Sequence, residues 1–118
     1  MNNYHEPMNL LDENTRNITR AINSLKEEVE AVDWYNQRIA ATNDAALKEI
    51  LIHNRDEEIE HACMTIEWLR RNMDKWDEEL RNHLFTDIPI AEAEKRGNLD
   101  HGTDKNDHPN GLTIGDMK

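Results

Sequence analysis

Glycine and proline are absent from most of this 118-residue chain. Neither occurs between Pro7 and Pro89, and all four glycines follow position 96. A segment that lacks both residues and is rich in Glu, Leu, Arg, Ala and Lys is typical of long, uninterrupted helices. The chain also has no apolar run near the roughly 20 residues that a membrane-spanning helix needs, so we expect no membrane partner. Residues 1–11 lack the basic and then apolar pattern of a signal peptide.

Cysteine and basic residues are also scarce. Cys63 is the single cysteine, which excludes an internal disulfide and fits a reducing cytosol; we expect it to pack as a small residue on a different face from His61. Lys and Arg number 14 against 25 Asp and Glu, for a formal charge of -11. A negative surface repels phosphate backbones, so nucleic acid is not an expected partner. Such a surface suits cations, although charge alone indicates no more than solubility.

Apolar residues recur at steps of mostly three and four in two long segments, which predicts two helices. The first should begin near Asn9, a good N-cap residue, and end near Ala41. The polar break at 42–44 can cap the second helix. Asp74 should cap a third, short helix, and Pro89 should stop the pattern. One row of the second helix consists of Leu47, Leu51, Asn54, Glu58, His61, Thr65 and Trp68.

The short break between the long helices predicts an antiparallel helical hairpin, so the expected fold class is all-α. Each long helix has about 30 residues and should span roughly 45 Å. Two such helices cannot enclose a core, because each offers an apolar stripe wider than one partner can cover. We therefore expect self-association, with a dimer completing a four-helix bundle.

The most informative residues are Glu58 and His61, which form an E-x-x-H unit. Their spacing of three places both side chains on one helical face, close enough to share a metal ion. They interrupt an apolar row, where a carboxylate is costly unless it is paired or bound to metal. Glu28 interrupts the stripe of the first helix, and Glu28 and Glu58 each lie 15 positions from Asn43. In an antiparallel hairpin these two carboxylates should therefore lie at the same height.

Two copies of the hairpin would supply Glu28, Glu58 and His61 twice, which is the ligand set of four-helix di-iron carboxylate proteins. Carboxylates and imidazoles without thiolate suit iron or manganese. The leading hypothesis is a ferroxidase, which oxidises Fe(II) to Fe(III) with oxygen as the acceptor. Two alternatives stay open. The same ligands could buffer or deliver metal without redox turnover, or the carboxylates could pair with Arg38 or Arg55 in a purely structural hairpin.

Five residues near these ligands are weaker candidates. Tyr35 lies on the face of the first-helix ligand, seven residues after it, and could hydrogen-bond a ligand or donate an electron, although a core tyrosine would look the same. His53 either lies behind the ligands or is a surface side chain. Glu27 and Glu30, with Trp34, line a neighbouring face. That face is either merely solvated or a site through which cations reach the ligands.

These residues lie in sequence runs that resemble the encapsulated ferritins. The runs are "EEVEAVDWYNQR", "HNRDEEIEHACMTIEWLRR" and "LFTDIPI", with "HEP" near the start, and the likeness covers roughly residues 5–90. The resemblance implies a ferritin-like two-helix protein that forms its ferroxidase site, with two irons, across a dimer interface and assembles as a ring of dimers. It also implies that the protein oxidises iron and that an encapsulin shell stores the mineral.

The same resemblance implies three kinds of functional residue, and the sequence departs from the family at none of them. The ferroxidase ligands are Glu28, Glu58 and His61. The residues near the site are Trp34, Tyr35 and His53. The site through which iron or other divalent cations enter consists of Glu27 and Glu30.

Composition divides the chain into a helical domain at 1–96, a flexible tether at 97–110 and a terminal peptide at 111–118. The tether has almost nothing to bury, and apolar residues then reappear among glycines in "GLTIGDMK". Many chain ends are merely ragged, but this peptide resembles the cargo-loading peptides that dock inside encapsulin shells. We therefore expect the protein in an encapsulin nanocompartment in the cytoplasm. The expected docking residues are Leu112, Ile114 and Met117.

Overall fold

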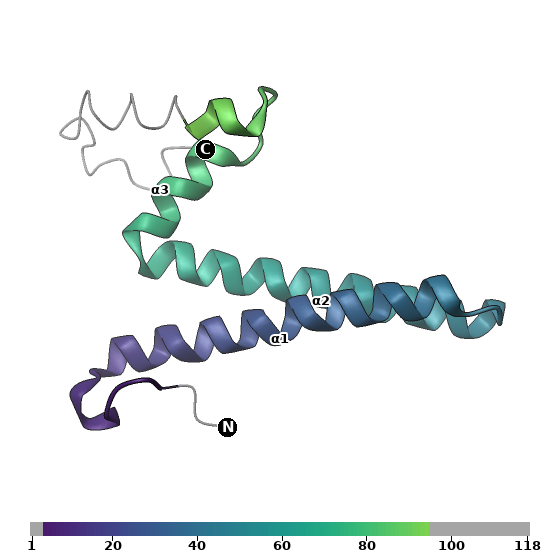
Figure 1. Ribbon diagram of the computed structural model, residues 1–118, viewed down its shortest axis with the longest axis horizontal. Helices are drawn as coiled ribbons and strands as arrows, with labels where there is room; N and C mark the ends of the chain where they lie inside the picture. The colour runs from purple at the N-terminus through teal and green to yellow at the C-terminus, as the bar shows by residue number, and fades with distance from the viewer. Residues whose placement is uncertain (1–3, 95–118) are drawn as a thin grey trace. The chain divides into compact units, whose positions relative to one another are not determined.

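The computed structural model describes residues 4–94 of the chain. Over that range it is all-helical, as predicted (Figure 1). The elements are a 3-10 helix η1 (Met8–Leu10) and the helices α1 (Glu13–Ala41), α2 (Ala45–Asn72) and α3 (Asp74–His83). Within the described range, no helix combines the length and apolar character needed to cross a membrane.

Helices α1 and α2 lie side by side as an antiparallel hairpin, which confirms the predicted architecture (Figure 1). Their lengths of 29 and 28 residues agree with the pattern of the sequence. Asp44 caps α2, because its Oδ1 accepts a hydrogen bond of 2.8 Å from the backbone N–H of Leu47. The polar break at 42–44 therefore both ends one helix and begins the next.

The predicted start of the first helix at Asn9 is wrong. Asn9 belongs to η1, and Asp12 is the N-cap of α1, with its Oδ1 accepting from the backbone N–H of Thr15 at 2.7 Å. Both residue types are good caps, and only one satisfies the free N–H groups of the longer helix. Arg16 ties η1 to α1 through a 2.8 Å hydrogen bond to the carbonyl oxygen of Met8.

The hairpin buries little by itself. In the part of the chain that the structure describes, Leu69 is the only large side chain that is fully buried. Other large apolar side chains of the hairpin stay substantially exposed, including Ile50 at 56% and Met64 at 63%. Two helices can each cover only one stripe of the other, so the remaining apolar surface of a single chain stays exposed.

Compact packing divides the chain between Asp74 and Lys75. The second unit includes most of α3, where ion pairs at i, i+4 join Lys75 to Glu79 at 2.8 Å and Arg81 to Asp77 at 3.0 Å.

The prediction that Pro89 stops the helical pattern is wrong. Residues 90–94 are helical, and the carbonyl oxygen of Pro89 accepts from the N–H of Glu92 at 2.9 Å. A proline suits a helix start, because the first turn needs no N–H donor there.

Three of the predicted features fall beyond residue 94. The tether at 97–110 and the peptide at 111–118, with its docking residues Leu112, Ile114 and Met117, lie outside the described residues.

Candidate metal centre

Glu58 and His61 form a close pair on α2, as their spacing predicts. The Nδ1 atom of His61 lies 3.6 Å from the Oε1 atom of Glu58. The Glu58 side chain is 29% exposed and the His61 side chain is 49% exposed, so both can be reached from outside the hairpin. A carboxylate and an imidazole at this separation can bind one metal ion together.

Glu28 is half-buried on α1 and is held by a residue of α2. Its Oε1 atom accepts a 3.1 Å hydrogen bond from the hydroxyl of Thr65. Thr65 follows His61 by one turn, and its hydroxyl also lies 3.2 Å from the carbonyl oxygen of His61. Glu28 is thereby attached to the turn of α2 that carries the imidazole.

The structure does not bring Glu28, Glu58 and His61 into one group. Among residues 4–94, no three His, Cys, Asp or Glu side chains gather closely enough to hold a metal ion. Glu28 contacts Thr65, which lies seven residues beyond Glu58, or about 10 Å along the helix axis. The expectation that all three ligands converge within one chain is therefore not met.

The reason for this separation is the direction of the side chains. In a helix each Cα–Cβ bond tilts toward the N-terminus. Helix α1 runs toward the connecting turn and α2 runs away from it. Glu28 therefore leans away from the turn, whereas Glu58 and His61 lean toward it. The equal number of residues from Asn43 to Glu28 and to Glu58 places the two backbones at similar heights, but it does not bring the two carboxylates together.

The arginines that could have neutralised these carboxylates have other partners. Arg55 donates from Nη1 to Oδ1 of Asn36 at 3.0 Å, and its Nη2 lies 3.1 Å from Oδ1 of Asp56. The guanidinium of Arg38 lies 5.2 Å from the ring centroid of Tyr35, a cation–π distance. The purely structural hypothesis, in which these arginines pair with the carboxylates, receives no support from these contacts.

The structure describes the surroundings of all five weaker candidates. Tyr35 is half-buried beneath the guanidinium of Arg38, whereas Trp34 is 49% exposed. His53 is exposed, with its Nε2 atom 3.4 Å from Oε2 of Glu57. The other two candidates, Glu27 and Glu30, are exposed on α1. Their roles in metal entry stay predictions.

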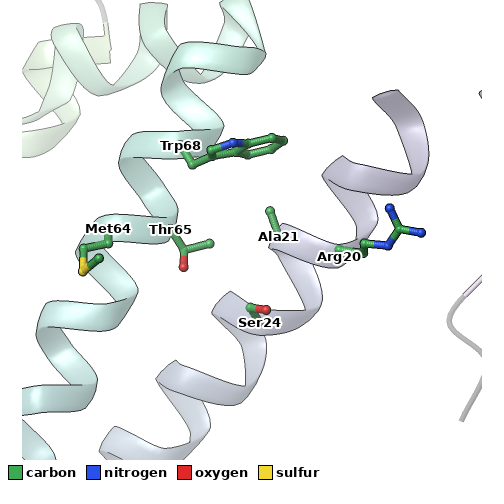
Figure 2. A pocket seen from close by; sticks show the side chains of 6 residues that line it. All are labelled: Arg20, Ala21, Ser24, Met64, Thr65 and Trp68. Atoms are coloured by element: carbon green, nitrogen blue, oxygen red, sulfur yellow. The ribbon is translucent and has the colours of Figure 1, made fainter. Parts of the chain in front are cut away.

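An apolar row accompanies His61 along α2. We call it the His61 row, and its members lie on one side of the helix in two groups, with the polar Asn54 and Glu57 between them. The members are Leu47, Ile50, His61, Met64 and Trp68. The four apolar members are exposed by 37% to 63%. Near its C-terminal end the row borders a shallow groove between the two helices, lined by Arg20, Ala21, Ser24, Met64, Thr65 and Trp68 (Figure 2).

Two other side chains on α2 are not candidate ligands. Glu67 accepts hydrogen bonds from Arg70 at 2.6 and 2.8 Å and from Arg71 at 2.6 Å. The hydrogen bonds from Arg70, and after them the bond from Arg71, lower the pKa of Glu67 from 4.5 to about 2, so this carboxylate is ionised and paired with arginine.

Cys63 is exposed, so the expectation that it packs is wrong. It lies two residues after His61, hence about 200° around the helix. The Glu58–His61 pair itself offers oxygen and nitrogen donors, which fit iron.

Sequence reasoning missed Thr65 as a site residue. Its one signal was its position as a polar residue in the row that contains Glu58 and His61. A threonine at such a position usually bonds only the carbonyl four residues earlier. The additional bond to Glu28 depends on how α1 sits against α2, which spacing along one helix does not reveal.

The chain is similar to proteins of one family over most of its length. The family described as EncFtn-like matches residues 3–87. A protein of Thermotoga maritima named "Ferritin-like protein" is 60% identical over 92 residues, which cover 78% of this chain and 81% of that protein. A protein of Rhodospirillum rubrum named "Encapsulated ferritin-like protein" is 55% identical over 102 residues, which cover 86% of this chain and 73% of that protein.

A solved structure is similar in fold as well. The crystal structure of a protein from Nitrosomonas europaea superposes with a TM-score of 0.74 and is 56% identical in sequence. The match covers 76% of this chain and 99% of that one. At this identity the likeness reflects common ancestry and a shared helical fold.

Proposed function

The chain belongs to the EncFtn-like family, and we propose that it is a ferroxidase whose di-iron site forms between two copies of the chain. The observation that supports the proposal best is the Glu58–His61 pair, held 3.6 Å apart at the accessible side of the hairpin. Within residues 4–94, one chain offers this pair without a third His, Cys, Asp or Glu close enough to complete a metal site. A second copy related by a two-fold axis would bring the same pair again, together with the Glu28 of both copies.

The apolar surroundings of the pair support association. His61 lies in the His61 row, whose apolar members a lone chain leaves exposed. Burying such a row against its own symmetry mate is favourable, because apolar surface leaves water on both copies. Without metal, the carboxylates of the two copies would face each other and oppose this contact. Iron between them would remove that opposition, so metal binding and dimerisation should be linked.

Iron is the substrate of the proposed reaction. Two Fe(II) ions each lose one electron, and dioxygen takes up both electrons with two protons to give hydrogen peroxide. The protein contributes position and charge. The carboxylates of Glu28 and Glu58 stabilise the higher charge of Fe(III), and the neutral imidazole of His61 supplies a nitrogen ligand without adding charge.

An encapsulin shell is the proposed destination of the oxidised iron. A relative at 55% identity carries the name "Encapsulated ferritin-like protein". We place this chain by analogy in an encapsulin nanocompartment of the cytoplasm, assembled as a ring of dimers. Residues 111–118 would dock on the inner wall of the shell and 97–110 would give them reach. Glu27 and Glu30 would admit Fe(II) or other divalent cations.

The test is Fe(II) oxidation by purified protein, followed by absorbance and by oxygen uptake. Glu58→Gln and His61→Ala should each abolish rapid oxidation, because one substitution removes two ligands from a two-fold site. Glu60→Gln is the matched control, since this exposed glutamate lies on the same helix about 200° from Glu58. Rapid oxidation by both ligand variants would refute the site. Metal binding without oxygen uptake by the wild type would instead favour a protein that buffers or delivers metal.

A further inference from the structure

The hydroxyl of Thr65 occupies a position between two acceptors. It lies 3.1 Å from the Oε1 atom of Glu28 and 3.2 Å from the backbone carbonyl oxygen of His61. A threonine hydroxyl has one proton, so it fully donates to one acceptor at a time. The carbonyl is fixed in the helix, whereas the carboxylate belongs to a flexible side chain on the other helix. The hydrogen bond between them therefore mainly limits the movement of the Glu28 carboxylate.

The location of Thr65 lets it act on a ligand without touching metal. It lies on the side of α2 that faces α1, across from the small side chains of Ala21 and Ser24 (Figure 2). It follows His61 by one turn and reaches Glu28 across the helix–helix contact. The bond thus joins the α1 ligand to the helical turn that carries the α2 imidazole.

We propose that Thr65 is a positioning residue for the metal ligand Glu28. By holding Oε1, its hydroxyl leaves Oε2 of Glu28 as the donor to metal and fixes the direction in which that donor points. The inference rests on the proposed site, and it adds a residue that contacts a ligand and no iron. Hydrogen bonds behind ligating carboxylates are worth about 10- to 100-fold in metal affinity.

Ordering a glutamate side chain has an entropic cost. A free glutamate samples several rotamers, and a metal ion that binds it must select one of them. Thr65 holds one rotamer before the metal arrives, the one in which Glu28 leans away from Glu58 and His61 of its own chain, so the metal that it would serve is one bound with the second copy of the chain. If Glu28 turns away, the hydroxyl keeps the His61 carbonyl as its acceptor, so no donor is left unsatisfied. The arrangement orients the ligand without trapping it.

Two substitutions at position 65 separate this role from packing. Thr65→Val keeps the branched shape and removes the hydroxyl, whereas Thr65→Ser keeps the hydroxyl and removes a methyl group. Thr42→Val is the matched control. The Thr42 hydroxyl donates to the carbonyl oxygen of Arg38, four residues earlier, just as the Thr65 hydroxyl donates to that of His61. Among residues 4–94, however, Thr42 has no carboxylate partner.

The experiment is calorimetric titration of the full chain with Zn²⁺, which takes oxygen and nitrogen ligands and has no redox chemistry. Thr65→Val should raise the dissociation constant by roughly 10- to 100-fold. Thr65→Ser and Thr42→Val should bind as the wild type does. In a Glu28→Gln background, Thr65→Val should add no further loss, because the hydroxyl acts through that carboxylate. Helix content, measured by circular dichroism, should be the same in all variants.

Two results would overturn the inference. One is equal Zn²⁺ affinity in wild type and Thr65→Val, and the other is a Thr65→Ser variant as weak as Thr65→Val. Glu58→Ala distinguishes these from a failure of the proposed site. If Glu58→Ala binds Zn²⁺ as tightly as the wild type, the metal lies elsewhere and the proposed function fails. If Glu58→Ala loses binding and Thr65→Val does not, only the role of Thr65 fails.

Discussion

Replacing Met64 with Ser tests whether the His61 row is an interface between two copies. Met64 lies one turn after His61 and is 63% exposed in one chain. Fully burying a methionine side chain is worth about 1.5–3 kcal/mol, so covering the part still exposed contributes about 1–2 kcal/mol. A two-fold interface contains the residue twice. The substitution should therefore weaken the dimer by about 2–4 kcal/mol, or roughly 30- to several-hundred-fold in the dissociation constant.

Sedimentation velocity over a dilution series, with saturating Zn²⁺, measures that constant. Met64→Leu is the matched control, because leucine keeps the volume and the apolar character of the side chain. We expect Met64→Leu to associate like the wild type and Met64→Ser to dissociate at a much higher protein concentration. Equal constants for the two variants would show that Met64 stays exposed in the dimer, and the His61 row would then not be the interface.

Three other perturbations have definite expected outcomes. Asp44→Ala removes the α2 cap and should lower the free energy of unfolding by about 0.5–2 kcal/mol in urea titrations, and an unchanged midpoint would contradict the capping role. Glu67 has its pKa lowered from 4.5 to about 2, so its pairing stabilises the folded state fully above pH 4.5 and less as pH falls toward 2. Between pH 4.5 and 2 the wild type should lose more free energy of unfolding than Glu67→Gln. The difference should be small, because the Glu67 side chain is 40% exposed, and parallel curves of stability against pH would refute the role of the pair. Deleting residues 111–118 should leave iron oxidation in solution intact and remove the protein from co-expressed encapsulin shells. Undiminished loading would show that the peptide does not target the protein to the shell.

The sequence predicts the hairpin well, because its signals are local. The absence of Gly and Pro from Pro7 to Pro89 and the polar break at 42–44 determine where two long helices run and where the chain reverses. The choice of Asp12 over Asn9 as a cap was not predictable in the same way. Both residues have suitable side chains, and the 3-10 turn that contains Asn9 and is bonded to Arg16 is visible only in the structure.

The candidate site is only half predictable from spacing. Glu58 and His61 share one helix, so their separation of three residues fixes their proximity. Glu28 lies on the other helix, and counting from the turn gives the height of its backbone without the direction of its side chain. Its contact with Thr65 appears only when the two helices are packed. Residues that meet across helices therefore need the structure, whereas residues that meet along one helix do not.

The most direct test of the shared di-iron site is native mass spectrometry during anaerobic titration with Fe(II). We predict that the wild type gains mass as dimers carrying two iron ions each, and that higher assemblies follow from these dimers. His61→Ala removes two ligands per dimer and should bind no iron pair at the same concentrations. A wild-type monomer that binds iron without associating, and that then oxidises it when oxygen is admitted, would contradict the shared site.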